Sequence, residues 1–330
     1  MSASANEVSD DLGGYGQVNA VGFLASLTLA IEKPRVAAQV RLKHLEMHNK
    51  HDPLTTEIFK RLLVLERFVD AQTVKLLETH PAAHWFMRIE KLPGEAFAKV
   101  LAEIEGFGRY YETSDPMIPR YDDQSVPAKY RQREAVTMNV EGEDKEYVWV
   151  AAIERFCQAS DLRKYAGLYP EAVPVAGQQL PFNRQLRTML WRVSENLIRA
   201  NGKLKGFYDQ YRAYKLAKLT EAGVKIIPTP KGRLCPTCGA EKILPKTTRF
   251  CPDCGTALIG KKEMEGILFA GHFHNMCRRR MEQLLLDCFW AVYREAEGLP
   301  TRQPYPLEFL QGHNRVITPE DLTDTPVSKE

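Results

Sequence analysis

The sequence has no hydrophobic run long enough to cross a membrane. The longest one near its start, VGFLASLTLAI at residues 21–31, is about half of what a transmembrane helix needs. The residues before it are acidic and lack the basic flank of a secretory signal peptide. These absences predict a soluble, cytoplasmic protein. With 330 residues and 44% hydrophobic content, the chain can build the core of one large or two ordinary domains.

A second absence concerns the loop AVPVAGQQLPFN at residues 172–183. It contains no Ser, Cys, Asp, Glu or His, so it supplies neither a nucleophile nor an acid–base group. A helix is predicted directly after it, at residues 183–199, and begins with Arg184 and Arg187. This stretch is therefore suited to binding an anion rather than to catalysis.

The net charge of +3 conceals a strong asymmetry along the chain. Residues 181–233 contain twelve Lys or Arg and three acids, a net charge of +9. Residues 308–330 contain five acids and two basic residues, a net charge of −3. Such blocks of one sign favour an interaction surface, and a basic block favours a polyanionic partner. The alternative is a basic helix that serves only solubility.

Cysteine is scarce, and four of the seven cysteines form one motif. Cys235 and Cys238 lie in CPTCG, and Cys251 and Cys254 lie in CPDCG. Two such Cys-x-x-Cys turns supply four thiolates for tetrahedral Zn²⁺, which is typical of a zinc ribbon. A four-thiolate site has no open position for water, so the predicted zinc is structural. Disulfides are the competing interpretation, which a cytoplasmic location disfavours.

A second group with ligand-type chemistry is His272, His274 and Cys277 in GHFHNMC. We expect these residues to cap and begin a helix predicted at residues 275–297. A second metal site remains the alternative.

The fold class predicted is mainly α. The chain is predicted to divide into N-terminal helices (1–50), a coiled-coil helix (51–82), a helical domain (83–230 and 261–300), a zinc ribbon (231–260) and an extended tail (301–330). Within residues 1–50, Pro34 is expected to separate helices at 17–31 and 35–50. Residues 106–148 are predicted to form an insertion that contains a β-hairpin.

The coiled-coil helix has clear sequence signals. Asp52 is the predicted N-cap and Pro53 the first helical residue. The apolar residues follow a 4-3-4-7 spacing that suits a coiled-coil seam: Ile58, Leu62, Leu65, Val69 and Leu76. This predicts a homodimer or higher homo-oligomer formed through residues 54–79, with an intramolecular hairpin with residues 17–50 as an equal alternative.

Two further segments carry candidate nucleic-acid contacts. The stretch RIEKLPGEAFAKVLAEI predicts a helix–hairpin–helix in which Lys91, Gly94 and Lys99 contact phosphate, although its usual second glycine is Ala96. In FYDQYRAYKLAKLTEAG, tyrosines at 208, 211 and 214 alternate with basic residues. These tyrosines suit either stacking on bases or packing in the core.

Several of these pieces occur in the order found in the insertion-sequence 110 family of Piv/MooV-type DEDD transposases, whose C-terminal domain the chain resembles. The pieces are the coiled-coil helix, RIEKLPGEAFAKVLAEI, ERFCQASDLRKYAGLYP, NRQLRTML, FYDQYRAYK and GHFHNMCRRRMEQLLLDCFW. The resemblance covers roughly residues 54–220 and 270–297, and KYAGLYP followed by NRQLRTML is its most specific part. It implies a helical transposase domain that contacts DNA and a structured guide RNA.

The chain departs from this family at both halves of the composite active site. Where the family has a nucleophilic serine before a glycine, this chain has Ala176 before Gly177. The acidic, RuvC-like domain of the family is also not found. The resemblance therefore implies binding without catalysis, similar to nuclease-free members of RNA-guided Tas-type systems.

On this hypothesis the basic residues contact the nucleic-acid backbone. The candidates are Lys164, Arg184, Arg187, Arg192, Lys203, Lys205 and Arg212. One alternative is an active recombinase that works with a partner RuvC-like nuclease and uses Ser160 or Ser194 as nucleophile. Another is a scaffold in which zinc and the coiled coil mediate protein assembly.

Overall fold

The computed structural model describes residues 15–92, 94–140, 142–169, 172, 175, 177–228, 233–235, 237–244, 248–258, 266–301 and 317–324. Within them the protein is mainly helical with a small antiparallel sheet, as predicted. The chain forms two compact units, Met1–Lys203 with Gln283–Glu330 (unit 1) and Leu204–Glu282 (unit 2). This boundary differs from the predicted one, because most of α9 (Lys203–Glu221) and the first half of α10 (Ala270–Ala296) group with the cysteine motif. No helix in the described part of the chain has the length and apolar character to span a bilayer.

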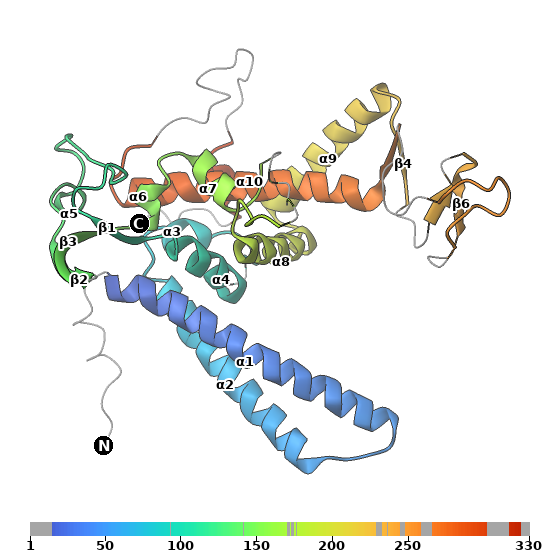
Figure 1. Cartoon of the computed structure of the whole chain (residues 1–330), viewed down its shortest axis with the longest axis horizontal. Coiled ribbons are helices and arrows are strands. Elements are labelled where there is room, and N and C mark those ends of the chain that lie inside the picture. Colours follow the sequence, from blue (N-terminus) through green and yellow to red (C-terminus); the bar gives the residue numbers. More distant parts are fainter. Residues whose placement is uncertain are drawn as a thin grey trace. The chain divides into compact units, whose positions relative to one another are not determined.

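Unit 1 begins with a long helical hairpin, α1 (Tyr15–Met47) and α2 (Pro53–Leu77), whose helices lie side by side (Figure 1). The predicted break at Pro34 is wrong, since α1 runs through it. Proline removes one N–H from the helix. Packing around this position offsets that loss: Ile31 and Ala38, about one turn to either side, are buried, and Arg35 pairs with Glu66 of α2.

The predicted start of α2 is confirmed. The Asp52 carboxylate accepts a hydrogen bond from the Thr55 amide at 3.1 Å, and Pro53 is the first helical residue. The apolar residues of the predicted seam are not equally buried: Val69 is buried, whereas Ile58 and Leu65 are nearly half exposed. Within one chain α2 therefore pairs with α1, as the alternative of an intramolecular hairpin predicted. This pairing leaves part of the apolar seam of α2 exposed.

The core of unit 1 is built on α4 (Gly94–Glu105), which packs against the hairpin and against α8 (Arg184–Ala200). Phe97 of α4 contacts Phe86 and Phe289, with ring centroids 5.0 and 5.8 Å apart. The first helix of the expected helix–hairpin–helix is reduced to the single turn α3 (Ala83–Phe86). The remaining short helices of unit 1 are α5 (Ala128–Arg131), α6 (Ala152–Arg155) and α7 (Ala159–Tyr165).

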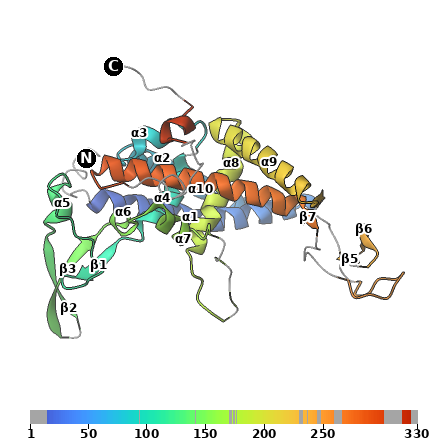
Figure 2. The same cartoon turned by 90° about the horizontal axis from the view of Figure 1, so that it is seen from above.

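The predicted β-hairpin is confirmed as β2 (Ala135–Val140) and β3 (Glu143–Val150). A strand that the sequence analysis missed, β1 (Arg109–Glu112), completes an antiparallel sheet of order β1-β3-β2 (Figure 2). Tyr111 of β1 pairs with Val148 of β3, and both lie in a small buried cluster. Because β1 lies at residue 109, the sheet ties the start of the insertion to its end.

The predicted extended tail is wrong for its described part. Pro319–Leu322 forms a 3₁₀ helix whose Leu322 is buried in unit 1. The Trp85 indole donates a hydrogen bond to the Pro319 carbonyl at 2.8 Å, and Arg88 pairs with Glu320 at 2.8 Å. This C-terminal segment therefore packs against the α3 turn.

Unit 2 contains most of α9 (Lys203–Glu221) and the first half of α10 (Ala270–Ala296). Strands β4 (Lys225–Ile227) and β7 (Ile267–Phe269) follow α9 and precede α10 in the chain and pair in parallel, so the segment that joins them leaves at one end of the strand pair and returns at the other. That segment carries β5 (Arg233–Cys235), β6 (Gly239–Leu244) and the cysteine motif.

Candidate metal centre and basic helix face

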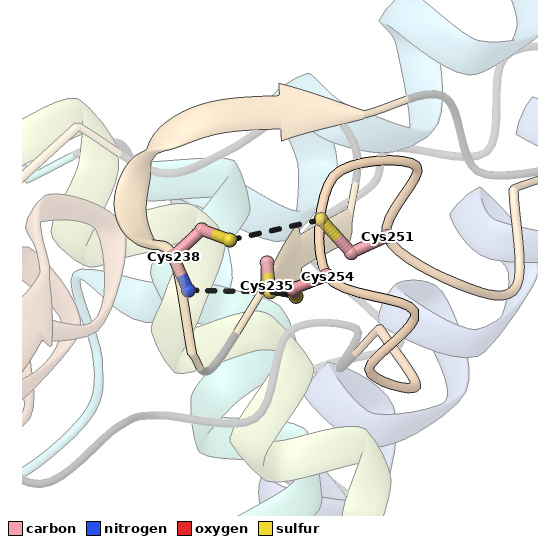
Figure 3. A group of neighbouring side chains, drawn as sticks. All are labelled: Cys235, Cys238, Cys251 and Cys254. Atoms are coloured by element: carbon pink, nitrogen blue, oxygen red, sulfur yellow. Dashed lines mark hydrogen bonds between the residues drawn. The ribbon is translucent and has the colours of Figure 1, made fainter.

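The four motif cysteines converge at one point (Figure 3). Their Sγ atoms all lie within 4.8 Å of one another, with Cys235–Cys254 at 3.4 Å and Cys238–Cys251 at 3.9 Å. A tetrahedron with Zn–S bonds of about 2.3 Å has sulfur–sulfur edges of about 3.8 Å. The cluster is therefore compatible with a structural zinc ion.

Local backbone geometry builds the two cysteine turns. In the first, the Cys238 amide points to the Cys235 sulfur at 3.3 Å. In the second, Gly255 adopts a left-handed φ of 70°, and its amide donates to the Cys251 carbonyl at 2.9 Å. Only a residue without a Cβ adopts this φ at little cost, which explains the glycine after Cys254. Cys235 and Cys251 are buried with Leu258 in a small core of their own.

The thiols differ in acidity. Hydrogen bonding with the side chain and backbone of Thr256 lowers the pKa of Cys254 to about 6, and the Thr256 hydroxyl lies 3.3 Å from the Cys254 sulfur. Hydrogen bonding to the neighbouring thiols Cys254 and Cys235 raises the pKa of Cys238 to about 12. A bound cation stabilises thiolates and favours deprotonation of all four ligands.

The second ligand-type group does not form a metal site. His274 lies within α10 rather than at its start, and its Nδ1 is hydrogen-bonded to the Tyr208 hydroxyl at 2.7 Å. Cys277 is fully buried, and burial raises its pKa. Among the described residues, no other set of three or more His, Cys, Asp or Glu side chains approaches metal-binding geometry.

Helix α8 forms within one residue of its predicted bounds. The Asn183 side chain caps it, accepting hydrogen bonds from the amides of Gln185 and Leu186 at 2.9 and 3.0 Å. One face is buried and contains Leu186, Leu190, Val193 and Leu197. The opposite face carries Arg184, Arg187, Trp191 and Arg192, which we call the α8 basic face.

The two most specific motifs, KYAGLYP and NRQLRTML, are in contact. The Asn183 amide donates to the Tyr165 carbonyl at 2.8 Å, and the Asn183 side chain donates to the Tyr165 hydroxyl at 2.8 Å. Gly167 has a φ of 70°, and a Cβ there would lie 2.7 Å from the Phe182 ring. The Arg187 guanidinium covers that same ring at 4.9 Å. These contacts close the loop and position the first turn of α8.

The other predicted basic contacts are divided between the units. In unit 1, Lys164 on α7 and Lys203 at the start of α9 are exposed. In unit 2, Arg212 is exposed above the Phe273 ring, whereas Lys205 pairs with Asp209. Ala176, which the resemblance to the insertion-sequence 110 family aligns with a serine, lies outside the described residues.

Lys99 must be removed from the predicted contacts. It is 7% exposed and pairs with Glu95 at 3.0 Å and with Glu32 at 3.8 Å, because α4 turns this face toward the hairpin. Gly94 packs against α2, with only 3.0 Å between its missing Cβ and Val74. Close packing against α2 thus explains why residue 94 is a glycine, and a phosphate contact is not needed to account for it.

Lys91 and Arg192 keep exposed charges. Lys91 follows the α3 turn with a left-handed φ of 54°, and its nearest acid is Glu90 at 3.7 Å. Arg192 lies 3.8 Å from Glu32 of α1, with 47% of its side chain exposed. Both cations remain accessible to an external anion.

The tyrosines of α9 differ in burial, so one suits packing in the core and another remains available for stacking on bases. Tyr208 is buried and bonded to His274, so it belongs to the core. Tyr214 is exposed, with the Lys218 ammonium 5.0 Å from its ring centre.

The hydroxyl groups of the two candidate serine nucleophiles are both engaged in hydrogen bonds. Ser194 is buried and donates to the Trp191 carbonyl, and the Ser160 hydroxyl donates to the Gln158 side chain.

Sequence reasoning missed Trp191, which is 47% exposed on the α8 basic face. Its helical spacing was a usable signal, since residues four and seven positions before it are Arg187 and Arg184.

No profile of a known protein family, no curated protein and no solved structure matches the chain.

Proposed function

We propose that the protein binds nucleic acid through the α8 basic face and does not itself cut or join strands. On this proposal it derives from a transposase or site-specific recombinase and binds DNA under the direction of a structured RNA. Descent and RNA guidance rest on the resemblance to the insertion-sequence 110 family. Binding rests on the geometry of α8.

The observation that carries the proposal is the separation of α8 into an apolar face and a basic face. Leu186 and Leu190 anchor the helix in unit 1, while Arg184 and Arg192 are exposed and Arg187 is half-buried over the Phe182 ring. Arginine forms paired hydrogen bonds to phosphate, and helix packing holds these cations in a fixed array. Lys164 and Lys203 are further exposed cations of unit 1.

The loop before α8 and the position of Ser194 support the proposed absence of catalysis. The loop has no nucleophilic side chain, and Ser194, an alternative nucleophile, is buried. An active recombinase would need its nucleophile from a partner chain or from Ser160. Strand transfer on a supercoiled donor with Mg²⁺, lost in a Ser160→Ala variant, would establish that alternative.

The test is a titration of the full chain with labelled DNA and RNA between about 50 and 200 mM salt. Each phosphate contact adds about 0.9 to the slope of log affinity against log salt for duplex DNA. Arg184→Ala with Arg187→Ala should weaken binding and lower this slope by about 2. Arg61→Ala removes an exposed arginine of the hairpin and serves as the control.

Unchanged affinity and slope in the double variant would remove the α8 basic face as the binding surface. RNA guidance is tested separately, by expressing the protein with its flanking DNA and sequencing the nucleic acid that copurifies. A discrete, structured RNA is expected. Random fragments would exclude guidance but leave general binding intact.

A second candidate function, protein assembly, is favoured by the hairpin. Nine large apolar side chains on it are more than 40% exposed: Phe23, Val36, Val40, Met47, Leu54, Ile58, Val64, Leu65 and Phe68. Exposed apolar patches of this kind mark association surfaces. We propose that a second copy of the chain covers them, as the predicted seam at residues 54–79 implies, and that the cysteine cluster is a structural zinc ribbon.

A further inference from the structure

We propose that Trp191 is a stacking platform, which makes the α8 basic face a site for single-stranded rather than duplex nucleic acid. This inference rests on the proposed nucleic-acid binding and names the form of its ligand. It starts from an exposed aromatic ring placed among cations.

Trp191 is more exposed than the other three tryptophans of the chain. Trp85 and Trp290 are buried, and their indole N–H groups donate to backbone carbonyls. Trp149 lies against Tyr110 in the sheet, with ring centroids 5.1 Å apart. Trp191 has 47% of its surface exposed on a helix whose opposite face is fully packed. About half of its surface is therefore accessible to a ligand.

The neighbours of Trp191 are suited to a polyanion. Arg187 lies one turn before it and Arg184 two turns before it, while Arg192 is the next residue. The guanidinium of Arg187 is held over the Phe182 ring, so its position is set before a ligand binds. Toward the C-terminal end, Glu195 lies 4.0 Å from Arg199 and adds a negative charge. The most positive part of the face thus comprises the first turns of α8 and ends around Trp191.

This combination distinguishes single strands from duplexes. In a duplex each base face is covered by its neighbours, and proteins contact base edges and phosphates. In a single strand the base faces are accessible, and aromatic rings stack on them beside cations that follow the backbone. An indole at the end of an arginine-rich face provides both contacts to one strand.

The test measures binding of the full chain to a labelled oligo-dT strand and to a duplex of the same length at about 50 mM salt. Trp191→Ala should weaken single-strand binding roughly 5- to 150-fold, the range expected for loss of one stacked base. Duplex binding should change less than about 2-fold. Trp191→Phe should retain most of the single-strand affinity, because a smaller ring still stacks. Tyr110→Ala, which removes an equally exposed aromatic side chain from the sheet, should have no effect.

Intrinsic fluorescence gives a second readout. Single strands should quench the tryptophan emission of the native chain, and Trp191→Phe should abolish this change. Equal losses on both ligands, or none in Trp191→Ala, would overturn the stacking proposal while leaving the arginine surface in place. Failure of the native chain to bind either ligand would overturn the proposed function itself, and the stacking proposal with it.

Discussion

The Asp324 carboxylate accepts a hydrogen bond from the backbone amide of Lys203 at 2.7 Å. Its other oxygen accepts a hydrogen bond from the Glu90 amide, also at 2.7 Å. Gly202 allows this approach, because a Cβ there would lie 3.0 Å from both carboxylate oxygens. One acidic side chain from the C-terminal segment therefore joins the start of α9 to the turn after α3.

This relationship predicts that Asp324→Ala destabilises unit 1. Loss of a helix N-cap costs about 1 kcal/mol, and hydrogen bonds to a charged acceptor raise the expected loss to about 1–3 kcal/mol. Urea unfolding of the full chain, followed by circular dichroism, measures the loss. Asp122→Ala, at an exposed acid outside these contacts, is the control. Equal stability of the two variants would show that the carboxylate does not hold the segment.

The contact between Gly167 and Phe182 predicts unequal effects of two glycine substitutions. Gly167 and Gly177 both have left-handed φ angles, 70° and 80°, so alanine at either costs about 1–2 kcal/mol of backbone strain. At Gly167 the added methyl also meets the Phe182 ring at 2.7 Å, whereas at Gly177 nothing lies within 4 Å. Gly167→Ala should therefore unfold at lower urea concentration, with an added loss of about 1–3 kcal/mol. Equal midpoints for the two variants would contradict the packing of this loop end on α8.

Metal removal should affect unit 2 selectively. We expect one zinc per chain, released by a strong chelator or by Cys251→Ser, with far-ultraviolet circular dichroism largely retained because most helices lie in unit 1. Released zinc is measured colorimetrically, and protease sensitivity within residues 233–258 should rise. Cys157→Ser, an exposed cysteine outside the cluster, should keep the metal. Full metal content in Cys251→Ser would exclude the four-thiolate site.

Asp70 predicts a pH dependence of stability. Burial and the nearby Glu95 raise its pKa to about 6, although the Thr28 hydroxyl donates to it at 3.1 Å. The folded state therefore binds more protons than the unfolded state between about pH 4 and 6, and stability falls as the pH rises through this window.

Asp70→Asn removes the ionisable carboxyl group and with it the loss of stability as the pH rises. Since Asp70 is only partly buried, solvent screening reduces the expected gain at pH 7 to about 1 kcal/mol, and the gain should vanish below pH 4. Thermal unfolding at pH 4, 5.5 and 7 measures the difference between the native chain and the variant. A difference independent of pH would show that the carboxylate does not titrate in this range.

The exposed seam of the hairpin predicts self-association. Leu65 and Phe68 of α2 are 46% and 60% exposed. Replacing both with glutamate places charges in the proposed interface, so sedimentation velocity should show a shift toward monomer. Lys60→Glu with Arg67→Glu adds the same acids at exposed polar positions of α2 and should not. A native chain that is monomeric at all concentrations would contradict assembly through a second copy.

The sequence by itself determined the features that depend on near neighbours. The cysteine turns, the Asp52 cap of α2, the β-hairpin and the bounds of α8 all follow from residues a few positions apart. A cap or a Cys-x-x-Cys turn is complete within one helical turn or loop, so its chemistry can be read without the rest of the chain.

Only the tertiary structure decided which side chains are buried, because burial depends on segments far apart in the chain. Lys99 was a plausible phosphate contact until α4 placed it beside Glu32 of the hairpin. Pro34 was a plausible helix break until packing on both sides held α1 continuous. Residues 317–324 are held in place by contacts with Trp85, Arg88 and Glu90, more than 200 residues earlier. The same long-range packing buried one face of α8 and left Trp191 exposed beside the arginines.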